Sequence, residues 1–451
     1  IMSINIVLIG AGEVGFNLAK VISKENYDLT VIDVDKKRCN RIQNTIDARV
    51  IQGNGCSQQI LQKIDFQNVD YFLSLTRIDE VNLVASRIAK KLGAKKVITR
   101  LRNTEYVHSD AIVTPSEFGI DHVIYPEKSA HFEIENLVRQ SSAVEMKDFS
   151  NDRIKLIGIK LENSSPLIGR SIKNVYLSNP YTLHRVPVIY RNDDTFIPHL
   201  DTIYKKDDVV YFCCLNEAID EIQKMSGKLS FKVKNIMILG LGKISRMIAK
   251  SLQSDFNVKV IEIDSNKAKQ YSPSLDDSLI LHGDGLDEEF LESENIHEID
   301  CFIATTENDK TNMLSSLMAK YHGIKQVIMH ITTTSYFKSM RSIGIDAVVS
   351  KNISAVNDVL KIIHSDKDEI SITPFEEIHL DALEIIVSKD SKYIYKKYTI
   401  EDIPESMCLG SIIREDKCIT PSYKKTVIIP GDKLLIFLHQ ESISKAESLF
   451  N

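Results

Sequence analysis

The sequence has few of the features that mark membrane, secreted or nucleic-acid-binding proteins. No stretch of the 451 residues approaches the roughly 18 consecutive apolar residues of a membrane span. We expect no signal peptide, because the first residues do not show its pattern. The formal net charge is −6, whereas a nucleic-acid binder usually carries a basic surface. We therefore expect a cytoplasmic protein that has no nucleic-acid partner.

Cysteine is scarce and shows no recognisable pattern. The seven cysteines include no C-x-x-C pair, and no histidines stand at the spacing of metal ligands. Unpatterned cysteines in an odd number are typical of free thiols in a reducing compartment. We expect free thiols and no metal site of any kind.

What the sequence does have is a glycine-rich turn between an apolar run and a helix-like segment. The run Asn5–Ile9 ends in glycines spaced as G-x-G-x-x-G, the order that a dinucleotide-binding βαβ unit requires. The first glycine permits a tight turn, the second lets the backbone approach a pyrophosphate, and the third lets helix and strand pack closely. The N–H groups at the helix start then face the phosphates. We assign cofactor contacts to the residues of this turn: Gly10, Ala11, Gly12, Glu13, Val14 and Gly15.

A second predicted strand ends in an acid. Asp33 closes the run Leu29–Ile32, at about the expected 20 residues beyond the glycines. A carboxylate at this place accepts the ribose hydroxyls of the adenosine half and repels a 2′-phosphate, which favours NAD over NADP. Asp35 is the better candidate for capping the next helix.

The whole unit occurs twice. Three segments return later in the chain at one constant spacing: Asn5–Gly12 returns as Asn235–Gly242, Gln52–Gly55 as His282–Gly285, and Ser74–Asp79 as Ala304–Asp309. A repeat of this length indicates a tandem duplication.

Within each copy, apolar strands alternate with amphipathic helices. This alternation predicts an α/β fold with a doubly wound parallel sheet in each copy, and each copy is followed by a smaller strand-rich α+β segment. We expect Rossmann domains at 1–140 and 233–365, and small domains at 141–225 and 366–451. The long helices predicted at Glu127–Gln140 and Ile353–His364 either cover their own sheet or cross onto a neighbour.

Further candidate contacts in the first copy follow its third and fourth strands. Asn54 and Gly55 lie at the carboxyl edge where open α/β sheets bind ligands, although a simple turn is the alternative. Leu75 and Thr76 follow the fourth strand. The pattern Thr76-x-x-Asp79 also matches a capping box, a helix start that needs no ligand.

The second copy departs from the pattern at its third glycine, where Ser245 stands. Serine is small enough to preserve the packing. Glu262 matches Asp33, and Asp284 brings a carboxylate close to any phosphates, which is unfavourable unless it turns away or meets a cation. We expect an adenine nucleotide here too, either NAD(H) or ATP or another adenine nucleotide, at these positions: Gly240, Leu241, Gly242, Lys243, Ile244, Glu262, Asp284 and Thr306.

Taken together, these motifs resemble the TrkA family, the peripheral NAD-binding subunits of Trk-type potassium uptake systems. The resemblance covers the whole chain and implies two RCK-N (KTN) and two RCK-C domains. It also implies a cytosolic regulator on the inner face of the plasma membrane that binds NAD or NADH and docks on a potassium-translocating subunit of TrkH or TrkG type. We expect a homo-oligomer, a tetramer. The resemblance further places a nucleotide-contacting arginine near Arg100, for which a solvated surface arginine is the alternative.

The competing reading is an NAD-dependent oxidoreductase. Hydride transfer needs a donor or acceptor group beside the reacting carbon, in a lobe that closes over the nicotinamide. Two Tyr-x-x-x-Lys strings, Tyr321–Lys325 and Tyr393–Lys397, do not lie where such a group is needed. We therefore expect a binding protein without catalytic residues.

Overall fold

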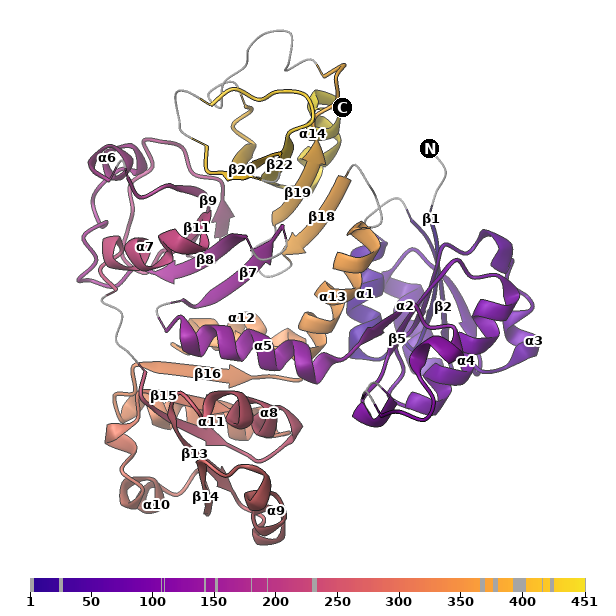
Figure 1. Ribbon diagram of the computed structural model, residues 1–451, viewed down its shortest axis with the longest axis horizontal. Coiled ribbons are helices and arrows are strands. Elements are labelled where there is room, and N and C mark those ends of the chain that lie inside the picture. The colour runs from indigo at the N-terminus through magenta and orange to yellow at the C-terminus, as the bar shows by residue number, and fades with distance from the viewer. Residues whose placement is uncertain are drawn as a thin grey trace. The chain divides into compact units, whose positions relative to one another are not determined.

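The protein is described by a computed structural model (Figure 1). The described residues are 4–23, 27–106, 108, 110–141, 143–150, 153–179, 181–192, 194–228, 233–365, 370–375, 380–391, 403–415, 417–421 and 426–450. They form two compact units. The first comprises Ile1–Phe132, His330–Tyr336 and Val349–Ile363, and the second comprises Glu133–Met329, Phe337–Val348 and His364–Asn451.

The first copy forms a six-stranded parallel sheet, as the alternation of strands and helices predicts. Its strands, in spatial order, are β3 (Arg49–Gln52), β2 (Tyr27–Asp33), β1 (Ile4–Ile9), β4 (Tyr71–Ser74), β5 (Lys96–Arg100) and β6 (His122–Ile124). Its connecting helices are α1 (Glu13–Ile22), α2 (Lys36–Thr45), α3 (Gln58–Leu61) and α4 (Asp79–Leu92). The strand order reverses between β1 and β4, and ligands of such sheets bind outside the carboxyl ends of the strands at that point.

The second copy repeats this topology in a second six-stranded sheet. Its strands, in spatial order, are β14 (Ser278–His282), β13 (Asn257–Glu262), β12 (Asn235–Leu239), β15 (Cys301–Ala304), β16 (Gln326–His330) and β17 (Ala347–Val349). Its helices are α8 (Lys243–Leu252), α9 (Ser265–Tyr271), α10 (Glu288–Ser293), α11 (Asp309–Tyr321) and α12 (Phe337–Ser342). The two doubly wound sheets expected from the repeat are thus confirmed.

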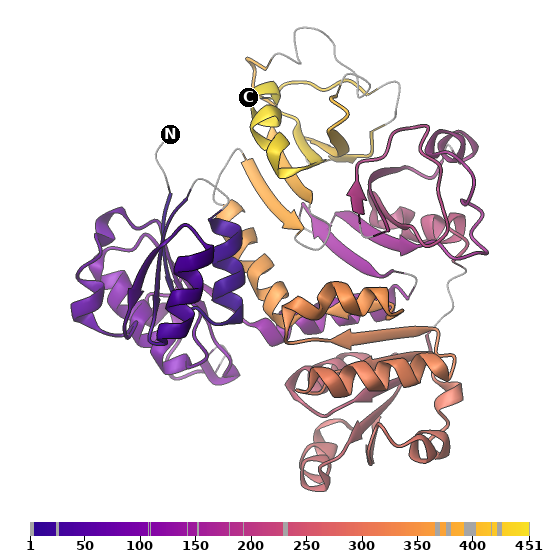
Figure 2. The ribbon, with the colours of Figure 1, turned by 180° about the vertical axis from the view of Figure 1, so that it is seen from behind.

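In the first unit, the first sheet is covered in part by a helix from the far end of the second copy. This helix is α13 (Lys351–Ser365), and it lies beside α1 in both ribbon views (Figures 1 and 2). Its buried side chains join one hydrophobic cluster with Leu8 of β1 and Leu18 of α1. They are Ala355, Val356, Val359, Leu360 and Ile363.

In the second unit, the helix that follows the first copy reaches the second sheet. This is α5 (Pro126–Arg139), and its Leu137 carbonyl accepts a 2.8 Å hydrogen bond from the Gln326 side chain of β16. Of the two possibilities left open by the sequence, the long helices take the crossing one. Helix periodicity shows that a helix has an apolar face, but it does not identify the surface that the face covers.

Each small segment forms a five-stranded antiparallel sheet. The first contains β7 (Glu145–Phe149), β8 (Ile154–Lys160), β9 (His184–Arg191), β10 (Asp194–Phe196) and β11 (Val209–Leu215), with helices α6 (Ile172–Ser178) and α7 (Ile219–Met225). The second contains β18 (Ile370–Phe375), β19 (Leu380–Ile386), β20 (Met407–Arg414), β21 (Lys417–Ile419) and β22 (Lys433–Leu438), with helix α14 (Ile443–Phe450). Side chains of both sheets share one core, in which Phe149 and Phe437 meet edge to face.

Among the described residues, no helix is both long and apolar enough to cross a lipid bilayer.

An ion pair between a buried carboxylate and a partly exposed arginine recurs in the two small sheets. Arg191 donates through Nε and Nη2 to the two oxygens of Asp208, at 2.6 and 2.7 Å, and Asp208 has no exposed side-chain surface. Arg414 and Asp432 make the same two contacts in the second sheet, at 2.7 and 2.8 Å. Hydrogen bonding to the carboxylate raises the pKa of each arginine. In the first sheet the pair connects the end of β9 to the residue just before β11, and in the second sheet it connects the end of β20 to the residue just before β22.

We expect Asp208→Asn to lower the free energy of unfolding by about 3 kcal/mol, because it leaves the Arg191 charge without its buried partner. Urea denaturation followed by circular dichroism measures the loss. The matched control is Asp207→Asn. Asp207 is exposed, and its φ of 65° is one that asparagine tolerates. Equal stability of the two variants would show that the ion pair contributes nothing.

Candidate functional site

The glycine turn has the backbone geometry that its sequence demands. Gly10 has a φ of 97°, in the left-handed region, and a Cβ there would lie 3.0 Å from the Thr76 nitrogen. A Cβ on Gly15 would lie 1.8 Å from the Gly10 carbonyl oxygen. A Cβ on Gly12, by contrast, would meet nothing within 4 Å. In the first copy, Gly10 and Gly15 therefore leave no room for a side chain, whereas Gly12 leaves open space at the start of α1.

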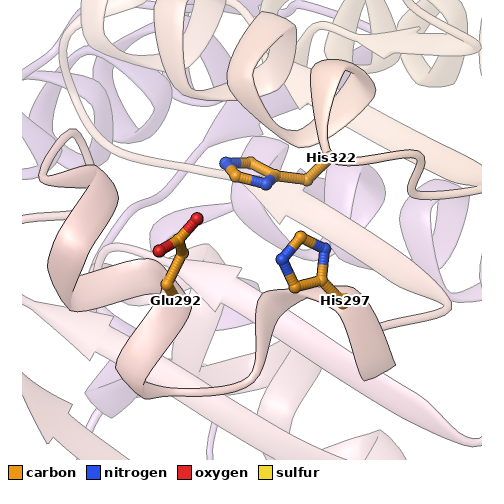
Figure 3. A group of neighbouring side chains, drawn as sticks. All are labelled: Glu292, His297 and His322. Carbon is orange, nitrogen blue, oxygen red and sulfur yellow. The ribbon is translucent and has the colours of Figure 1, made fainter.

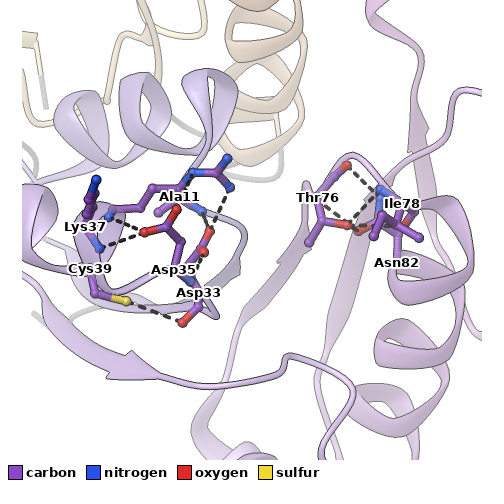
Figure 4. A network of polar contacts seen from close by, with 9 residues as sticks. Ala11, Asp33, Asp35, Lys37, Cys39, Thr76, Ile78 and Asn82 are labelled. Atoms are coloured by element: carbon purple, nitrogen blue, oxygen red, sulfur yellow. Dashed lines mark hydrogen bonds and ion pairs between the residues drawn. The ribbon is translucent and has the colours of Figure 1, made fainter.

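The acid at the end of β2 is tied to this turn (Figure 4). The Asp33 carboxylate is buried and accepts hydrogen bonds from the Ala11 N–H at 2.6 Å and from the Asp35 N–H at 2.8 Å. One bond falls on each oxygen, so each oxygen keeps a lone pair for a ribose hydroxyl. The Asp35 side chain accepts from the N–H groups of Lys37 and Arg38, which confirms it as the cap of α2.

In both copies a basic side chain that was not predicted from the sequence lies beside the acid that ends the second strand, Asp33 or Glu262. Arg38 Nη1 is 3.7 Å from Asp33 Oδ2, and its side chain is 45% exposed. In the second copy, Lys267 Nζ is 2.9 Å from Glu262 Oε2. The available signal was a basic residue in the first turn of the second helix of both copies.

Asn82 joins the loops that follow β4 and β5. Its amide oxygen accepts from the Thr76 N–H at 3.0 Å, the Thr76 hydroxyl at 2.7 Å and the Ser74 hydroxyl at 3.0 Å. Its amide nitrogen donates to the carbonyls of Thr76 at 3.1 Å and Arg100 at 2.8 Å. Asn82 is fully buried, so it fixes the carboxyl edge of the sheet from within.

The capping-box interpretation of Thr76 and Asp79 is wrong. Helix α4 begins at Asp79, and its N-cap residue, Ile78, has no side chain that can accept a hydrogen bond. The Asp79 carboxylate instead accepts from the N–H groups of Arg102 and Asn103, at 2.9 and 2.7 Å. These bonds anchor the loop after β5, so the carboxylate supports the edge rather than the helix start.

Arg100 ends β5 and is only 7% exposed, so the solvated-arginine alternative is wrong. Its Nε is buried and has no hydrogen-bond partner. Burial lowers the pKa of Arg100, and the nearby Glu127 carboxylate acts in the opposite direction. A buried guanidinium with an unused N–H is suited to an anionic ligand.

The remaining candidates of the first copy are placed by local packing. Leu75 is buried and donates to the Ile9 carbonyl at 2.9 Å. The Asn54 side chain accepts from the Cys56 N–H at 2.9 Å, which is the turn that the sequence left as an alternative. A Cβ on Gly55 would lie 2.3 Å from Ile9 Cγ2, so a larger residue there would displace β1.

The first helical turn carries the other two candidates. Val14 is buried, and Glu13 Oε1 lies 3.5 Å from Arg41 Nη1 of α2. In the second copy, Lys243 and Ile244 begin α8 in the same way.

The second copy reproduces the connection between acid and turn. Glu262 accepts from the Leu241 N–H at 2.9 Å and the Asp264 N–H at 3.0 Å. Burial raises the pKa of Glu262, but these two bonds and the contact with Lys267 outweigh burial, so its pKa lies below the usual value. The Glu262 carboxylate is therefore held in its charged form.

The other loops of the second copy also match the first. Gly240 has a φ of 92°, and Thr306 bonds to the Asn312 side chain as Thr76 does to Asn82. A Cβ on Gly242 has no neighbour closer than 3.9 Å. The Asp284 carboxylate accepts from the Leu286 N–H at 2.9 Å, so one of its oxygens is used by the turn.

The missing third glycine is compensated by a neighbouring change. The Ser245 hydroxyl lies 2.7 Å from the Thr305 hydroxyl, which donates to the Leu239 carbonyl at 3.2 Å. The first copy has Gly15 and Leu75 at these two positions. Serine and threonine thus appear together, and each satisfies the buried polar group of the other.

Neither Tyr-x-x-x-Lys motif considered for hydride transfer is placed beside these loops by the described residues. Tyr321 ends α11, at the opposite end of that helix from Asn312, and is 83% exposed. Tyr393–Lys397 lies outside the described residues.

Comparison with protein families and curated proteins gives a consistent result. The TrkA-N domain matches residues 6–126 and again 236–351. The Trk system potassium uptake protein TrkA of Vibrio alginolyticus is 28% identical, and the alignment covers 99% of this chain and 98% of that protein. The TrkA homolog of Archaeoglobus fulgidus is 31% identical, with 99% of each chain covered.

Solved structures share the fold. The GsuK RCK domain has a TM-score of 0.61 at 14% identity, covering all of this chain and 95% of that one. The GsuK channel bound to NAD gives 0.61 at 13% identity, covering all of this chain and 79% of that one. A GsuK structure bound to ADP gives 0.51 at 13% identity, covering 81% of this chain and 70% of that one. At these identities the likeness shows the fold alone.

The different surroundings of two glycines predict different outcomes for the same substitution. We expect Gly15→Ala to destabilise the protein by about 3 kcal/mol, because its methyl group would overlap the Gly10 carbonyl. We expect Gly12→Ala to change stability by no more than about 0.5 kcal/mol while weakening nucleotide binding, since its methyl group occupies only the open space. Thermal unfolding and NADH titration of each variant measure the two effects. Gly12→Ala with unchanged affinity would show that no ligand uses that space.

Proposed function

Because the chain belongs to the TrkA family, we propose that it is an NAD(H)-binding regulatory subunit that controls potassium uptake through a separate membrane protein. The observation that carries the proposal is the set of groups that meet at the carboxyl edge of the first sheet. The open space at Gly12, the acceptor oxygens of Asp33 and the unused N–H of buried Arg100 border the carboxyl edge of one sheet. These are the groups that a pyrophosphate and a ribose require.

NAD(H) is the ligand that fits these residues. The N–H groups at the start of α1 and the guanidinium of Arg100 would hold the pyrophosphate, and Asp33 would accept the ribose hydroxyls. The fold neighbours determined with NAD and with ADP support an adenine nucleotide. For the second copy we propose a nucleotide with different preference, NAD(H) or ATP or another adenine nucleotide, because Lys243 and Asp284 change the charge near the phosphates.

We propose that the role is binding rather than catalysis. The relatives are named as potassium uptake proteins, which supports a regulator over an oxidoreductase. The residues around the first crevice supply hydrogen bonds and charge to a nucleotide. The one described Tyr-x-x-x-Lys string, Tyr321–Lys325, starts at a solvent-exposed tyrosine.

Regulation would act by a shift of population. A ligand changes an equilibrium only if it binds one arrangement better than the other. Helix α5 is suited to carry such a difference, because groups at its two ends interact with different sites. The Glu127 carboxylate in its first turn attracts the Arg100 guanidinium, and the Leu137 carbonyl near its end accepts a hydrogen bond from Gln326 of β16. A coupling of about 1–3 kcal/mol changes an affinity by about 5–150-fold.

The partner would be a potassium-translocating membrane protein of TrkH or TrkG type. The names of the relatives support a Trk system. We propose that the chain works in the cytoplasm on the inner face of the plasma membrane, as a homo-oligomer and specifically a tetramer. The GsuK channel, which shares the fold, is a precedent for such domains in a channel protein.

Asp33 should set the choice between the two dinucleotides. We expect the full chain to bind NADH more tightly than NADPH by about tenfold or more, because a 2′-phosphate would meet the Asp33 carboxylate, and tenfold corresponds to about 1.4 kcal/mol. Calorimetric titration measures both affinities, with Glu262→Ala included to identify any signal from the second copy.

Asp33→Ala should narrow the difference, whereas Asp35→Ala, which removes the helix cap but leaves the Asp33 carboxylate in place, should preserve it. If wild-type protein bound NADPH as tightly as NADH, Asp33 would have no role in ligand choice.

The regulatory role predicts a loss of potassium uptake when nucleotide cannot bind. We expect cells that lack the protein to take up potassium slowly, and Gly12→Trp, which fills the pyrophosphate space, to restore uptake poorly. Rubidium uptake measures the rate. Tyr181→Trp is the control, because Tyr181 is 93% exposed and the change leaves the crevice intact. Full uptake without the protein, or with folded Gly12→Trp that binds no nucleotide, would contradict the proposal.

A further inference from the structure

A cluster of metal-ligating side chains lies in the second copy, away from the nucleotide loops. Glu292, His297 and His322 each offer one ligand atom, and these atoms lie within 4.8 Å of one another. Figure 3 shows the carboxylate and the two imidazole rings turned toward one shared space. Glu292 lies in α10, His297 in the short 3-10 helix Ile296–Glu298, and His322 at the end of α11.

This cluster stands at the amino edge of the second sheet. His297 comes just before β15, and His322 comes just before β16. The nucleotide loops, including Thr306, follow the carboxyl ends of the same strands. Helix α11 runs between the two edges, so the cluster is separate from the crevice.

The side chains combine one fixed group with adjustable ones. The His322 side chain is only 4% exposed. The centroid of its ring lies 5.2 Å from that of His297 and 5.6 Å from that of Tyr321. Glu292 and His297 are exposed and can adjust. A fourth group is available, since Glu288 Oε1 lies 3.9 Å from His322 Nε2 and its side chain is 60% exposed.

The first copy provides an internal comparison for each ligand. At the positions of Glu292, His297 and His322 it has Gln62, Gln67 and Leu92, and at that of Glu288 it has Gln58. In the first copy, a 3.4 Å hydrogen bond from the Gln67 side-chain amide to the Leu92 carbonyl connects the same two segments. Three amides and an aliphatic side chain have thus been replaced by two carboxylates and two imidazoles on the same backbone. Packing alone does not require that change, because the first copy packs without it.

We propose that the second copy binds a divalent transition-metal ion of the zinc type through Glu292, His297 and His322, with Glu288 or water as the fourth ligand. Two imidazoles and a carboxylate form a donor set that zinc accepts, at about 2.0–2.2 Å from each ligand. Closing the 4.8 Å cluster onto one ion needs only movement of the exposed side chains. The ion then links α10, the 3-10 helix and α11. The expectation of no metal considered only ligands close in sequence, whereas these three come from separate elements.

The test is a zinc titration of the full chain after removal of metal by a chelator. We expect one zinc ion per chain by calorimetry, and cobalt(II) in its place to give the visible absorption of a tetrahedral site. His297→Gln and Glu292→Gln should each weaken binding by about tenfold or more. The triple variant Glu292→Gln/His297→Gln/His322→Leu, which installs the residues of the first copy, should abolish it. Circular dichroism and NADH titration show that each variant is folded.

Two further variants sharpen the result. His199→Gln is the matched control, because His199 is exposed and its Nδ1 lies 3.9 Å from a single exposed carboxylate oxygen, Glu405 Oε1, in the described part of the chain. It should leave zinc binding unchanged. The reciprocal triple variant Gln62→Glu/Gln67→His/Leu92→His should create a second site in the first copy. Failure of the wild-type chain to bind zinc, or equal binding by the folded triple variant that carries the residues of the first copy, would overturn the proposal.

Discussion

The hydrogen bond from the glycine turn to the acid of the second strand is the constraint on which the candidate site of each copy depends. Asp33 receives the Ala11 N–H, and Glu262 receives that of Leu241. The bond fixes the turn against β2 or β13 and places the start of the first helix. It also gives a hydrogen-bond partner to a carboxylate inside the edge of the sheet, where an unpaired charge would be costly. The same atoms therefore stabilise the fold and, in the proposed function, contact the ribose of the nucleotide.

The two copies show that such a scaffold tolerates change when partners change together. The contact between the first two helices is a second example. In the first copy Arg41 of α2 covers the Phe16 ring at 3.5 Å, and in the second copy Arg246 of α8 covers the Tyr271 ring at 3.7 Å. The cation has moved to the other helix, and the contact remains. A duplicated chain thus contains its own record of which interactions matter and which residues merely supply them.

Much of the fold could be predicted from local pattern. The glycine turn, the strand-two acid and the repeat specify two Rossmann sheets because each depends on residues close in sequence. Asp35 was identified as a cap for the same reason. The crossing of α13 was left open, since an apolar helix face does not name its partner.

Residues that act through burial or distant contacts were harder to identify. Arg100 reads as a surface residue until the loops above β5 are folded, and Asp79 has the spacing of a capping box although its carboxylate bonds to the loop after β5. Asn82 occupies an ordinary helix position in the sequence. Its importance comes from five hydrogen bonds to residues at the carboxyl ends of β4 and β5. The periodicity of the sequence does not reveal these contacts.

The contribution of α13 to the first core has a consequence for biosynthesis. The first sheet is complete in the chain at Ile124, but the helix that covers part of it begins only at Lys351. At ribosomal speeds of about 5–20 residues per second, the apolar surface of β1 and α1 waits roughly 10–50 s for its cover. During that interval the nascent chain exposes a sheet face that is buried in the finished protein, so a holding chaperone or slow early folding would protect it. Fusion of the two copies into one polypeptide guarantees that the cover arrives on the same chain.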